Sequence, residues 1–458
     1  MEPTGIRFGG GVTATLLHPL VAVAIALAII LVVFLPRKYI IVPLLLAIFF
    51  IPKGQVLVMA GVHFTAAKIL FLAGLVRWAT TRRSLTLAGG FNSIDRVFTL
   101  CALSSLLVFS LRWMDSQAFI KSLGDLLDAL GGYFVLRFLI QDRNDVSRTI
   151  KVLAFIAMLA AVCMINEQVT GANIFERLGG MPPTTVRDGQ VRSQAAFEVF
   201  ITAGTYGATV LPLLVWLWSD AKSRIGSFLG IIGATVMVVT CHASTTLSAY
   251  AAGILALCLW PLRKNMRLVR WGLVLTILAL HVVMNGPVWS LIEKVDLTGS
   301  SSSYHRYMLI DNCIRHFGEW WLLGVKDYDK WGFDMWDLSD QYVAYAVGGG
   351  LLTLVLFISI ISRSFQRLGM ARKVAGGNQK EQWFLWCLGA ALFAHVVAYF
   401  GIGYFDQMQF AWYALLAIIS GETALDRLRL RRFKAEPSHS PRMYPCEASQ
   451  EFITDGVH

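Results

Sequence analysis

Long apolar stretches, most of them closed by Arg or Lys, follow one another along almost the whole chain. A run of about 20 apolar residues is long enough to cross about 30 Å of hydrocarbon as a helix. Inside lipid the backbone must satisfy its own hydrogen bonds, so we expect helices and not strands. The predicted apolar segments are 16–35, 39–51, 54–76, 94–112, 120–140, 150–169, 199–218, 226–241, 245–262, 268–288, 341–361, 383–404 and 408–420.

The pattern predicts an all-α fold, a polytopic transmembrane helical bundle of about 12–13 helices. The count is open because segment 39–51 is too short to cross a bilayer comfortably. No internal repeat is evident, and we expect residues 1–420 to form a single transmembrane domain. Its longest polar interruptions are the loops at about 170–198 and 289–340, and we expect short amphipathic helices in the second.

The composition also favours a membrane protein. Of the 458 residues, 56% are hydrophobic and 15% are charged, whereas soluble proteins average about 45–50% and about 25%. The formal charge of +11 comes from basic clusters at the ends of apolar segments, which indicates topology signals and not nucleic-acid binding. The seven cysteines have no zinc-like spacing.

The distribution of Lys and Arg predicts the orientation of the chain. The rule that positive loops stay inside places the basic loops and the C-terminus in the cytoplasm. The loops 170–198 and 289–340 then lie on the opposite, extracytoplasmic face. The basic tail 421–458 is expected to be cytoplasmic and disordered. The first apolar run has no small-residue cleavage site, so we interpret it as a retained helix.

The stretch 304–317 has the pattern of an amphipathic helix. Steps of 100° per residue place its apolar residues on one stripe: Tyr307, Ile310, Ile314 and Phe317. His305, Asn312 and His316 fall opposite. The two histidines are eleven residues apart, about 16 Å along a helix, too far to share a metal ion. A helix that only lies in the membrane interface is the simpler alternative.

Arginines in the two extracytoplasmic loops are candidate phosphate ligands. Arg306 opens the amphipathic helix, and Arg187 and Arg192 lie in the loop 170–198. The guanidinium group offers a fixed fork of donors that matches phosphate oxygens and keeps its charge. Two loops that each present arginine on one membrane face could hold a diphosphate between them.

Carboxylates mark the start of the apolar segment 341–361. Asp337 and Asp340 stand at the membrane surface, where a carboxylate could accept a proton from a hydroxyl group. With His305 they are the candidate catalytic residues. Capping of the helix N-terminus is an equally good explanation for Asp340.

Two further carboxylates, Asp125 and Asp128, lie inside the segment 120–140 and form a possible intramembrane polar site. The alternative is structural: Lys121 pairs with Asp125, and a hydrogen-bonded Asp128 stabilises the bundle. Lys68 and Arg137 lie nearer the ends of their segments and are expected to extend toward the interface.

Nucleotide chemistry is not indicated. The chain contains no Walker-A loop, Rossmann glycine pattern, H-E-x-x-H or G-x-S-x-G motif. We therefore expect no cofactor and no metal, and nucleotide-driven transport is disfavoured.

Three stretches resemble a known family, and the third of them, 305–333, continues into 337–358. They are RSQAAFEVFITAGTYGATVLPLL at 192–214, HASTTLSAYAAG at 242–253 and HRYMLIDNCIRHFGEWWLLGVKDYDKWGF at 305–333, with DLSDQYVAYAVGGGLLTLVLFI at 337–358. They are similar to motifs of the O-antigen ligase and Wzy-type polysaccharide polymerase family of bacterial envelopes. Ser339-Asp340 stands where the ligases have a His-Asn pair, which favours a polymerase or exopolysaccharide variant.

The resemblance implies a glycosyltransferase in the bacterial inner membrane that moves a glycan from undecaprenyl diphosphate to a sugar hydroxyl. It implies no metal or cofactor, and its partners would be the lipid-linked glycan, membrane lipids and other polysaccharide-synthesis and export proteins. Arg192 and Arg306 would bind the diphosphate with help from Arg187, and Asp340 or Asp337 would orient or deprotonate the acceptor. A lipid-linked oligosaccharide flippase and a non-catalytic scaffold are the alternatives.

Overall fold

A computed structural model describes residues 15–59, 62–81, 87–187, 189–284, 286–294, 302–332 and 334–435. The first nine helices are α1 (Pro19–Phe34), α2 (Arg37–Phe50), α3 (Ala66–Thr80), α4 (Ser93–Trp113), α5 (Ser116–Leu126), α6 (Gly132–Leu139), α7 (Arg143–Thr170), α8 (Phe200–Leu217) and α9 (Arg224–Thr240). The others are α10 (Ser244–Cys258), α11 (Met266–Val283), α12 (Leu291–Lys294), α13 (Ser302–Arg315), α14 (Phe317–Trp320), α15 (Gln341–Ala375), α16 (Gln379–Ala398) and α17 (Met408–Ala435).

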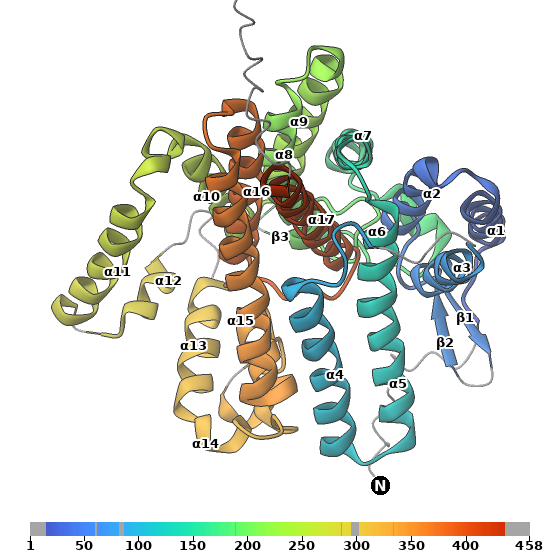
Figure 1. The fold of residues 1–458 in the computed structure, drawn as a ribbon. Helices are drawn as coiled ribbons and strands as arrows, with labels where there is room; N and C mark the ends of the chain where they lie inside the picture. The colour runs from blue at the N-terminus through green and yellow to red at the C-terminus, as the bar shows by residue number, and fades with distance from the viewer. Residues whose placement is uncertain are drawn as a thin grey trace, which may run out of the picture.

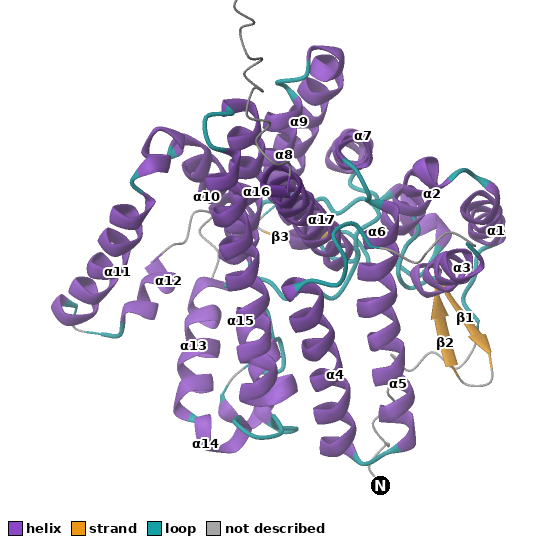
Figure 2. Cartoon of the chain, in the orientation of Figure 1, coloured by secondary structure: helices purple, strands orange, loops and turns teal. Residues whose placement is uncertain are grey.

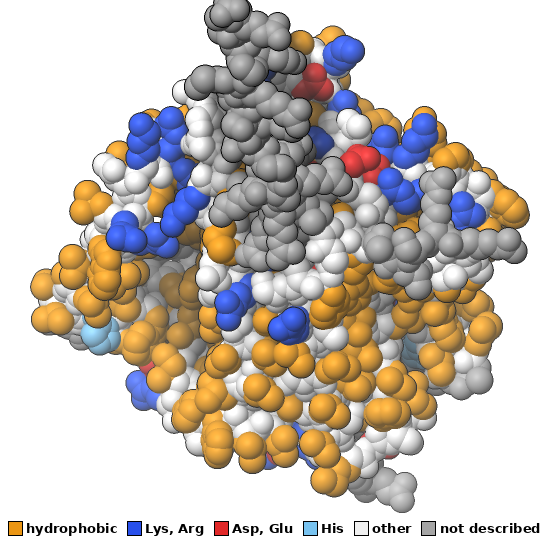
Figure 3. Space-filling model, viewed as in Figure 1, with side chains coloured by type: hydrophobic (Ala, Val, Ile, Leu, Met, Phe, Trp, Pro, Cys, Tyr) orange, Lys and Arg blue, Asp and Glu red, His pale blue; other side chains and the backbone are white. Residues whose placement is uncertain are grey.

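The prediction of a helical membrane protein is confirmed in its coarse form. The molecule is a bundle of helices, and its named strands in the described residues form two short hairpins (Figures 1 and 2). Among the described residues, seven helices are long and apolar enough to cross a membrane. Figure 3 shows hydrophobic side chains over most of the lower half of one face, while Lys and Arg gather mainly in its upper half. α11 is apolar and has no buried residue.

Two of the predicted segments have a different local structure. Segment 54–76 is not one helix: it begins with an antiparallel hairpin of β1 (Val56–Met59) and β2 (Val62–Thr65). α3 starts only at Ala66, because the Thr65 hydroxyl accepts the N–H of Lys68 and caps the helix. Segment 120–140 is divided by a π-helical turn at Leu127–Gly131.

The C-terminal tail also departs from the prediction. α17 continues to Ala435, so the expected disorder from residue 421 is wrong for residues 421–435. Residues 436–458 lie outside the described part of the chain.

The basic loops that we expected on one membrane face contact one another. The Arg37 guanidinium donates to the Leu139 carbonyl at 2.9 Å and pairs with Asp145 at 2.9 Å. Arg372 donates to the Arg263 carbonyl at 3.3 Å. Loops far apart in sequence therefore come together at one end of the bundle.

Small residues bring α7, α8 and α9 into close contact. A side chain at Gly207 would meet the Ala234 carbonyl oxygen at 2.5 Å, and one at Gly233 would meet that of Ala157 at 2.8 Å. Such small-residue contacts are typical of helix pairs in membranes, where close packing replaces the hydrophobic effect.

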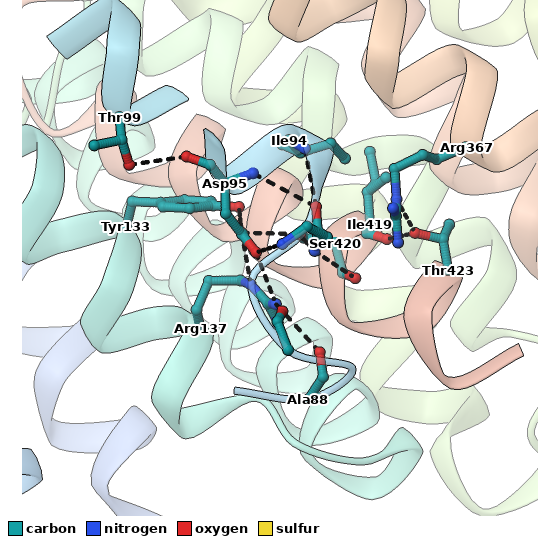
Figure 4. A network of polar contacts seen from close by, with 12 residues as sticks. Ala88, Ile94, Asp95, Thr99, Tyr133, Arg137, Arg367, Ile419, Ser420 and Thr423 are labelled. Atoms are coloured by element: carbon teal, nitrogen blue, oxygen red, sulfur yellow. Dashed lines mark hydrogen bonds and ion pairs between the residues drawn. The ribbon is translucent and has the colours of Figure 1, made fainter. Parts of the chain in front are cut away.

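A buried ion pair joins three helices (Figure 4). Arg137 and Asp95 have no exposed side-chain surface, and their groups meet twice, Nε to Oδ1 at 3.1 Å and Nη2 to Oδ2 at 3.3 Å. The hydroxyl groups of Tyr133 and Ser420 donate to Asp95 at 2.5 and 3.0 Å. The prediction that Arg137 extends to the interface is therefore wrong, because Asp95 on α4 holds it inside.

α15 is two helical arms joined at a sharp bend. Gly350 has φ +69° and ψ −178°, a conformation that is essentially restricted to glycine. The rings of Tyr345 and Phe357 lie 4.2 Å apart, although twelve residues of a straight helix would span about 18 Å. The short arm (341–349) therefore folds back on the long arm (351–375). The Leu351 N–H donates to the Trp321 carbonyl at 2.8 Å at this bend.

Substitution of Arg137 should test the buried pair. Arg137→Met leaves the Asp95 carboxylate buried without its cation, which costs about 3–5 kcal/mol. Lys121→Met removes a partly exposed pair with Asp125 and should cost only about 0.2–1 kcal/mol. Thermal unfolding in detergent should show a large loss of Tm for the first variant and a small one for the second. Equal losses would contradict this role.

The bend can be tested with neighbouring glycines. Gly350→Ala forces a side chain into a left-handed conformation and within 2.5 Å of the Leu322 carbonyl oxygen. We expect a loss of about 1–3 kcal/mol from strain, and more from the clash. Gly348→Ala is the control, because a side chain there would meet open space. The measurement is again thermal unfolding, and similar Tm values for the two variants would rule out a fixed bend at Gly350.

Candidate functional site

The connection between α16 and α17, residues 399–407, is mostly buried in the bundle, and we call it the central connection. Ile402, Asp406 and Gln407 are almost completely buried in it. Polar backbone groups inside an apolar bundle need partners, because lipid supplies none. Side chains from several distant elements supply them, and Arg306 is the predicted site residue among these partners.

Arg306 contacts the central connection. Its Nε donates to the carbonyl oxygen of Gly401 at 3.3 Å, and the Thr245 hydroxyl of α10 donates to the same oxygen at 3.3 Å. Arg306 is only 6% exposed. A guanidinium group, a hydroxyl group and a backbone carbonyl from three separate elements therefore meet at one point.

The predicted amphipathic helix exists as α13, but its packing face differs from the prediction. Asn312 was expected on the open polar face and is 6% exposed, whereas Ile314 was expected on the apolar stripe and is 49% exposed. α13 packs with Arg306, Leu309 and Cys313 inward, next to α15. The arginine thus points into the protein and not along the interface.

Asp340 is the most deeply placed of the predicted acids. Its side chain is fully buried, and Oδ1 accepts the N–H of Val343 at 2.9 Å, which makes it the N-cap of α15. Oδ2 has no hydrogen-bond partner among the described residues. Burial raises the pKa of this carboxyl to about 7, against the opposing effects of the Val343 and Tyr342 N–H groups and the Arg306 charge. The two oxygens can therefore have different roles: Oδ1 caps the helix, and Oδ2 can accept a proton.

Asp337 and His305 form the outer part of the same cluster. The His305 ring Nε2 lies 3.0 Å from the Asp337 carbonyl oxygen. Burial raises the pKa of Asp337, while His305 and Arg306 oppose this shift with their positive charge. The structure thus brings together four residues that sequence patterns singled out: His305, Arg306, Asp337 and Asp340.

Arg192 lies near the start of the turn 242–246. It ends β4 (Gln190–Arg192), and its guanidinium group stands over the Phe200 ring at 4.9 Å from the centroid. Burial lowers the pKa of His242, and the charge of Arg192 lowers it further. Since Thr245 follows His242 by three residues, both arginines lie near the turn 242–246.

Arg187 lies farther along the hairpin. It ends β3 (Thr185–Arg187) and pairs with Gln190 next to the turn, whereas Arg192 pairs with Thr185 at the other end. Arg187 is partly buried. The three predicted diphosphate ligands are therefore spread over two places, with Arg187 at the tip of the hairpin.

The intramembrane acids separate from each other. Asp125 pairs with Lys121 at 2.7 Å, as the structural alternative predicted. Asp128 lies in the π-helical turn and pairs instead with Lys68 of α3 at 3.5 Å. The prediction that Lys68 extends to the interface is therefore wrong, because this partly buried lysine turns toward Asp128.

Sequence reasoning missed the acid of the central connection. Asp406 is fully buried, accepts the Thr202 hydroxyl at 2.5 Å and accepts the Met408 N–H at 2.9 Å. Burial raises its pKa to about 6. Lys53, which donates to the Phe405 carbonyl and pairs with Glu198 at 3.6 Å, lies close by. The polar run Asp406-Gln407 between two apolar segments was the available clue.

No three His, Cys, Asp or Glu side chains in the described residues lie close enough to hold a metal ion. The charged groups of the site are instead the guanidinium groups of Arg192 and Arg306, the amino group of Lys53, and the carboxyls of Asp337, Asp340 and Asp406. No protein-family model matches the chain, and a search of curated proteins found no significant match.

A pH series on Asp340→Asn should separate the two roles of this residue. The folded carboxyl titrates near 7 and the unfolded one near 3.9, so folding binds a proton between these values. Stability then falls as the pH rises from about 4 to about 7. Asparagine caps the helix equally well but does not titrate. The Tm of Asp340→Asn minus that of the wild type should rise over this pH range and then stay level. A Tm difference that does not change with pH would contradict a raised pKa at Asp340.

Proposed function

We propose that this protein is a polysaccharide polymerase or ligase of the bacterial inner membrane. In this proposal it transfers a glycan from undecaprenyl diphosphate to a sugar hydroxyl at the outer face of that membrane. The observation that carries the proposal is that Arg306 and Asp340, both buried in an apolar bundle, lie near enough for the arginine charge to act on the carboxyl. Such a transfer needs a cation that binds the anionic leaving group and a base that accepts the hydroxyl proton.

In the proposed step the acceptor hydroxyl oxygen attacks the anomeric carbon of the donor sugar. The bond between that carbon and the diphosphate oxygen breaks, and the diphosphate leaves with the electron pair. Arg306 and Arg192 bind the charge that develops on it, so the step uses no metal. The hydroxyl proton passes to Oδ2 of Asp340. A pKa of about 7 suits this group to accept a proton near neutral pH.

The capping contact supports this assignment, because it fixes the carboxyl. Oδ1 is held by the Val343 N–H, so the plane of the group is set before the substrate arrives. Asp337 is the outer acid in this scheme. It lies beside His305 and Arg306 and would help to orient the acceptor.

A lipid-linked oligosaccharide flippase is the second candidate. The pairing of Lys68 with Asp128 between helices favours it, because transporters place charged groups within the membrane. Transporters also commonly contain inverted repeats, and the sequence shows none. Loss of function after Asp128→Asn with full function after Arg306→Lys would favour the flippase.

The two arginines of α13 provide a matched test of the transferase. Arg306→Lys keeps the charge but loses the fork of donors, so we expect a loss of about 10²-fold in transfer rate. Arg315→Lys changes the same residue type on the same helix, but that side chain is 70% exposed and pairs with Asp311. Its rate should stay near that of the wild type.

The assay uses purified protein with lipid-linked repeat units and follows longer glycans and released undecaprenyl diphosphate. Normal transfer by Arg306→Lys at equal protein level would overturn the assignment of Arg306. No product from the wild type would count against the transferase itself.

A further inference from the structure

A cavity lies beside the proposed site, between α4, α5, both arms of α15, and α17. Its volume is about 270 Å³, which at about 30 Å³ per water holds roughly nine waters or one sugar ring. α4, α5 and α15 run side by side around it (Figure 1). We call it the hydroxyl cavity after the groups that line it.

Several of its polar groups make no hydrogen bond within the described residues. They are the side-chain NH2 of Gln341, the amide of Gln409 and the hydroxyl groups of Ser105, Tyr345 and Tyr413. Some side-chain polar atoms of the described residues are fully buried without a hydrogen bond, but none of these five groups is among them. Each of the five therefore faces open space. The Gln341 orientation is fixed, because its Oε1 accepts the Tyr404 N–H. Its NH2 group therefore faces away from that contact.

Groups of this kind are costly in an apolar bundle unless a polar ligand or water satisfies them. The set combines neutral donors and acceptors with aromatic rings, among them Tyr345 and Tyr413. The carboxylate of Asp125, which also lines the cavity, is already paired with Lys121. The lining thus matches a neutral ligand that has many hydroxyl groups and an apolar face.

Another cavity of the molecule is not lined by such polar groups. The space between α3, α5 and α6, about 800 Å³, is larger but is lined almost entirely by leucine and aromatic side chains. It suits hydrocarbon. The unpaired polar groups are therefore a property of the hydroxyl cavity and not of every gap between these helices.

We propose that the hydroxyl cavity binds a sugar ring of the acceptor glycan. This inference rests on the proposed function for the role of the sugar. Gln341 connects the two sites, because it lines the cavity and directly follows Asp340 in the chain. A ring bound by Gln341, Tyr345 and Tyr413 would therefore contact the residue that follows the acid proposed to take the hydroxyl proton.

The binding test uses protein in lipid nanodiscs, prepared with a detergent that has no sugar headgroup. The probes are the methyl glycosides of glucose, galactose and N-acetylglucosamine, and glucuronic acid is the charged comparison. Ligand-observed NMR and tryptophan fluorescence report binding. We expect saturable binding of at least one neutral glycoside, stronger than that of glucuronic acid.

Tyr345→Phe and Tyr413→Phe each remove one hydroxyl group and should raise the Kd about three- to tenfold. Tyr206→Phe is the matched control, because its buried hydroxyl donates to the Leu153 carbonyl away from the cavity. It should leave the Kd unchanged. No saturable binding, or equal Kd values in all variants, would overturn the proposal and leave a cavity that only holds water.

Activity separates this inference from the proposed function. Arg306→Lys should slow transfer by about 10²-fold and keep glycoside binding. Specific binding without any transfer by the wild type would remove the transferase and keep a sugar site. Transfer with an unchanged acceptor KM in Tyr345→Phe and Tyr413→Phe would remove the sugar site and keep the transferase.

Discussion

The central connection 399–407 is the constraint on which the site depends. A chain that turns between two helices and is mostly buried must find protein partners for the polar groups that it buries. The Gly401 carbonyl accepts hydrogen bonds from Thr245 of α10 and Arg306 of α13. The Phe405 carbonyl accepts one from Lys53, and the Asp406 carboxylate accepts one from Thr202 of α8. The side chains that meet this need are the ones that could hold an anionic substrate, so folding and function use the same contacts.

The sequence pattern predicted most of the helices, because length and hydropathy are local properties. It missed what long-range contacts decide. The hairpin before α3 and the π-helical turn at Leu127–Gly131 interrupt apolar runs that a periodicity argument reads as continuous. Arg137 and Lys68 were expected at the interface, but acids on neighbouring helices hold them inside. No spacing rule indicates such a partner, since Asp95 is 42 residues away from Arg137.

In the candidate site, too, local properties were predictable from the sequence and long-range contacts were not. Residue type identified Arg306 and Asp340, because forked cations and acids at helix ends are recognisable from sequence. Their burial was not predictable. The prediction placed Ile314 on an apolar stripe and Asn312 on the opposite polar face, whereas Ile314 is exposed and Asn312 is buried. Asp406 was missed altogether, because its importance comes from its place in the fold and not from a motif.

The bend at Gly350 explains how one segment can serve both the membrane and the site. A straight helix from Gln341 to Ala375 would carry its N-terminus far beyond the bundle, about 50 Å from its other end. The bend turns the short arm back, so that Gln341 donates its backbone N–H to Tyr399 and Asp340 lies in the interior. Capping and chemistry then need not compete at Asp340. Oδ1 secures the helix end, and that bond holds Oδ2 in a fixed direction beside the charge of Arg306.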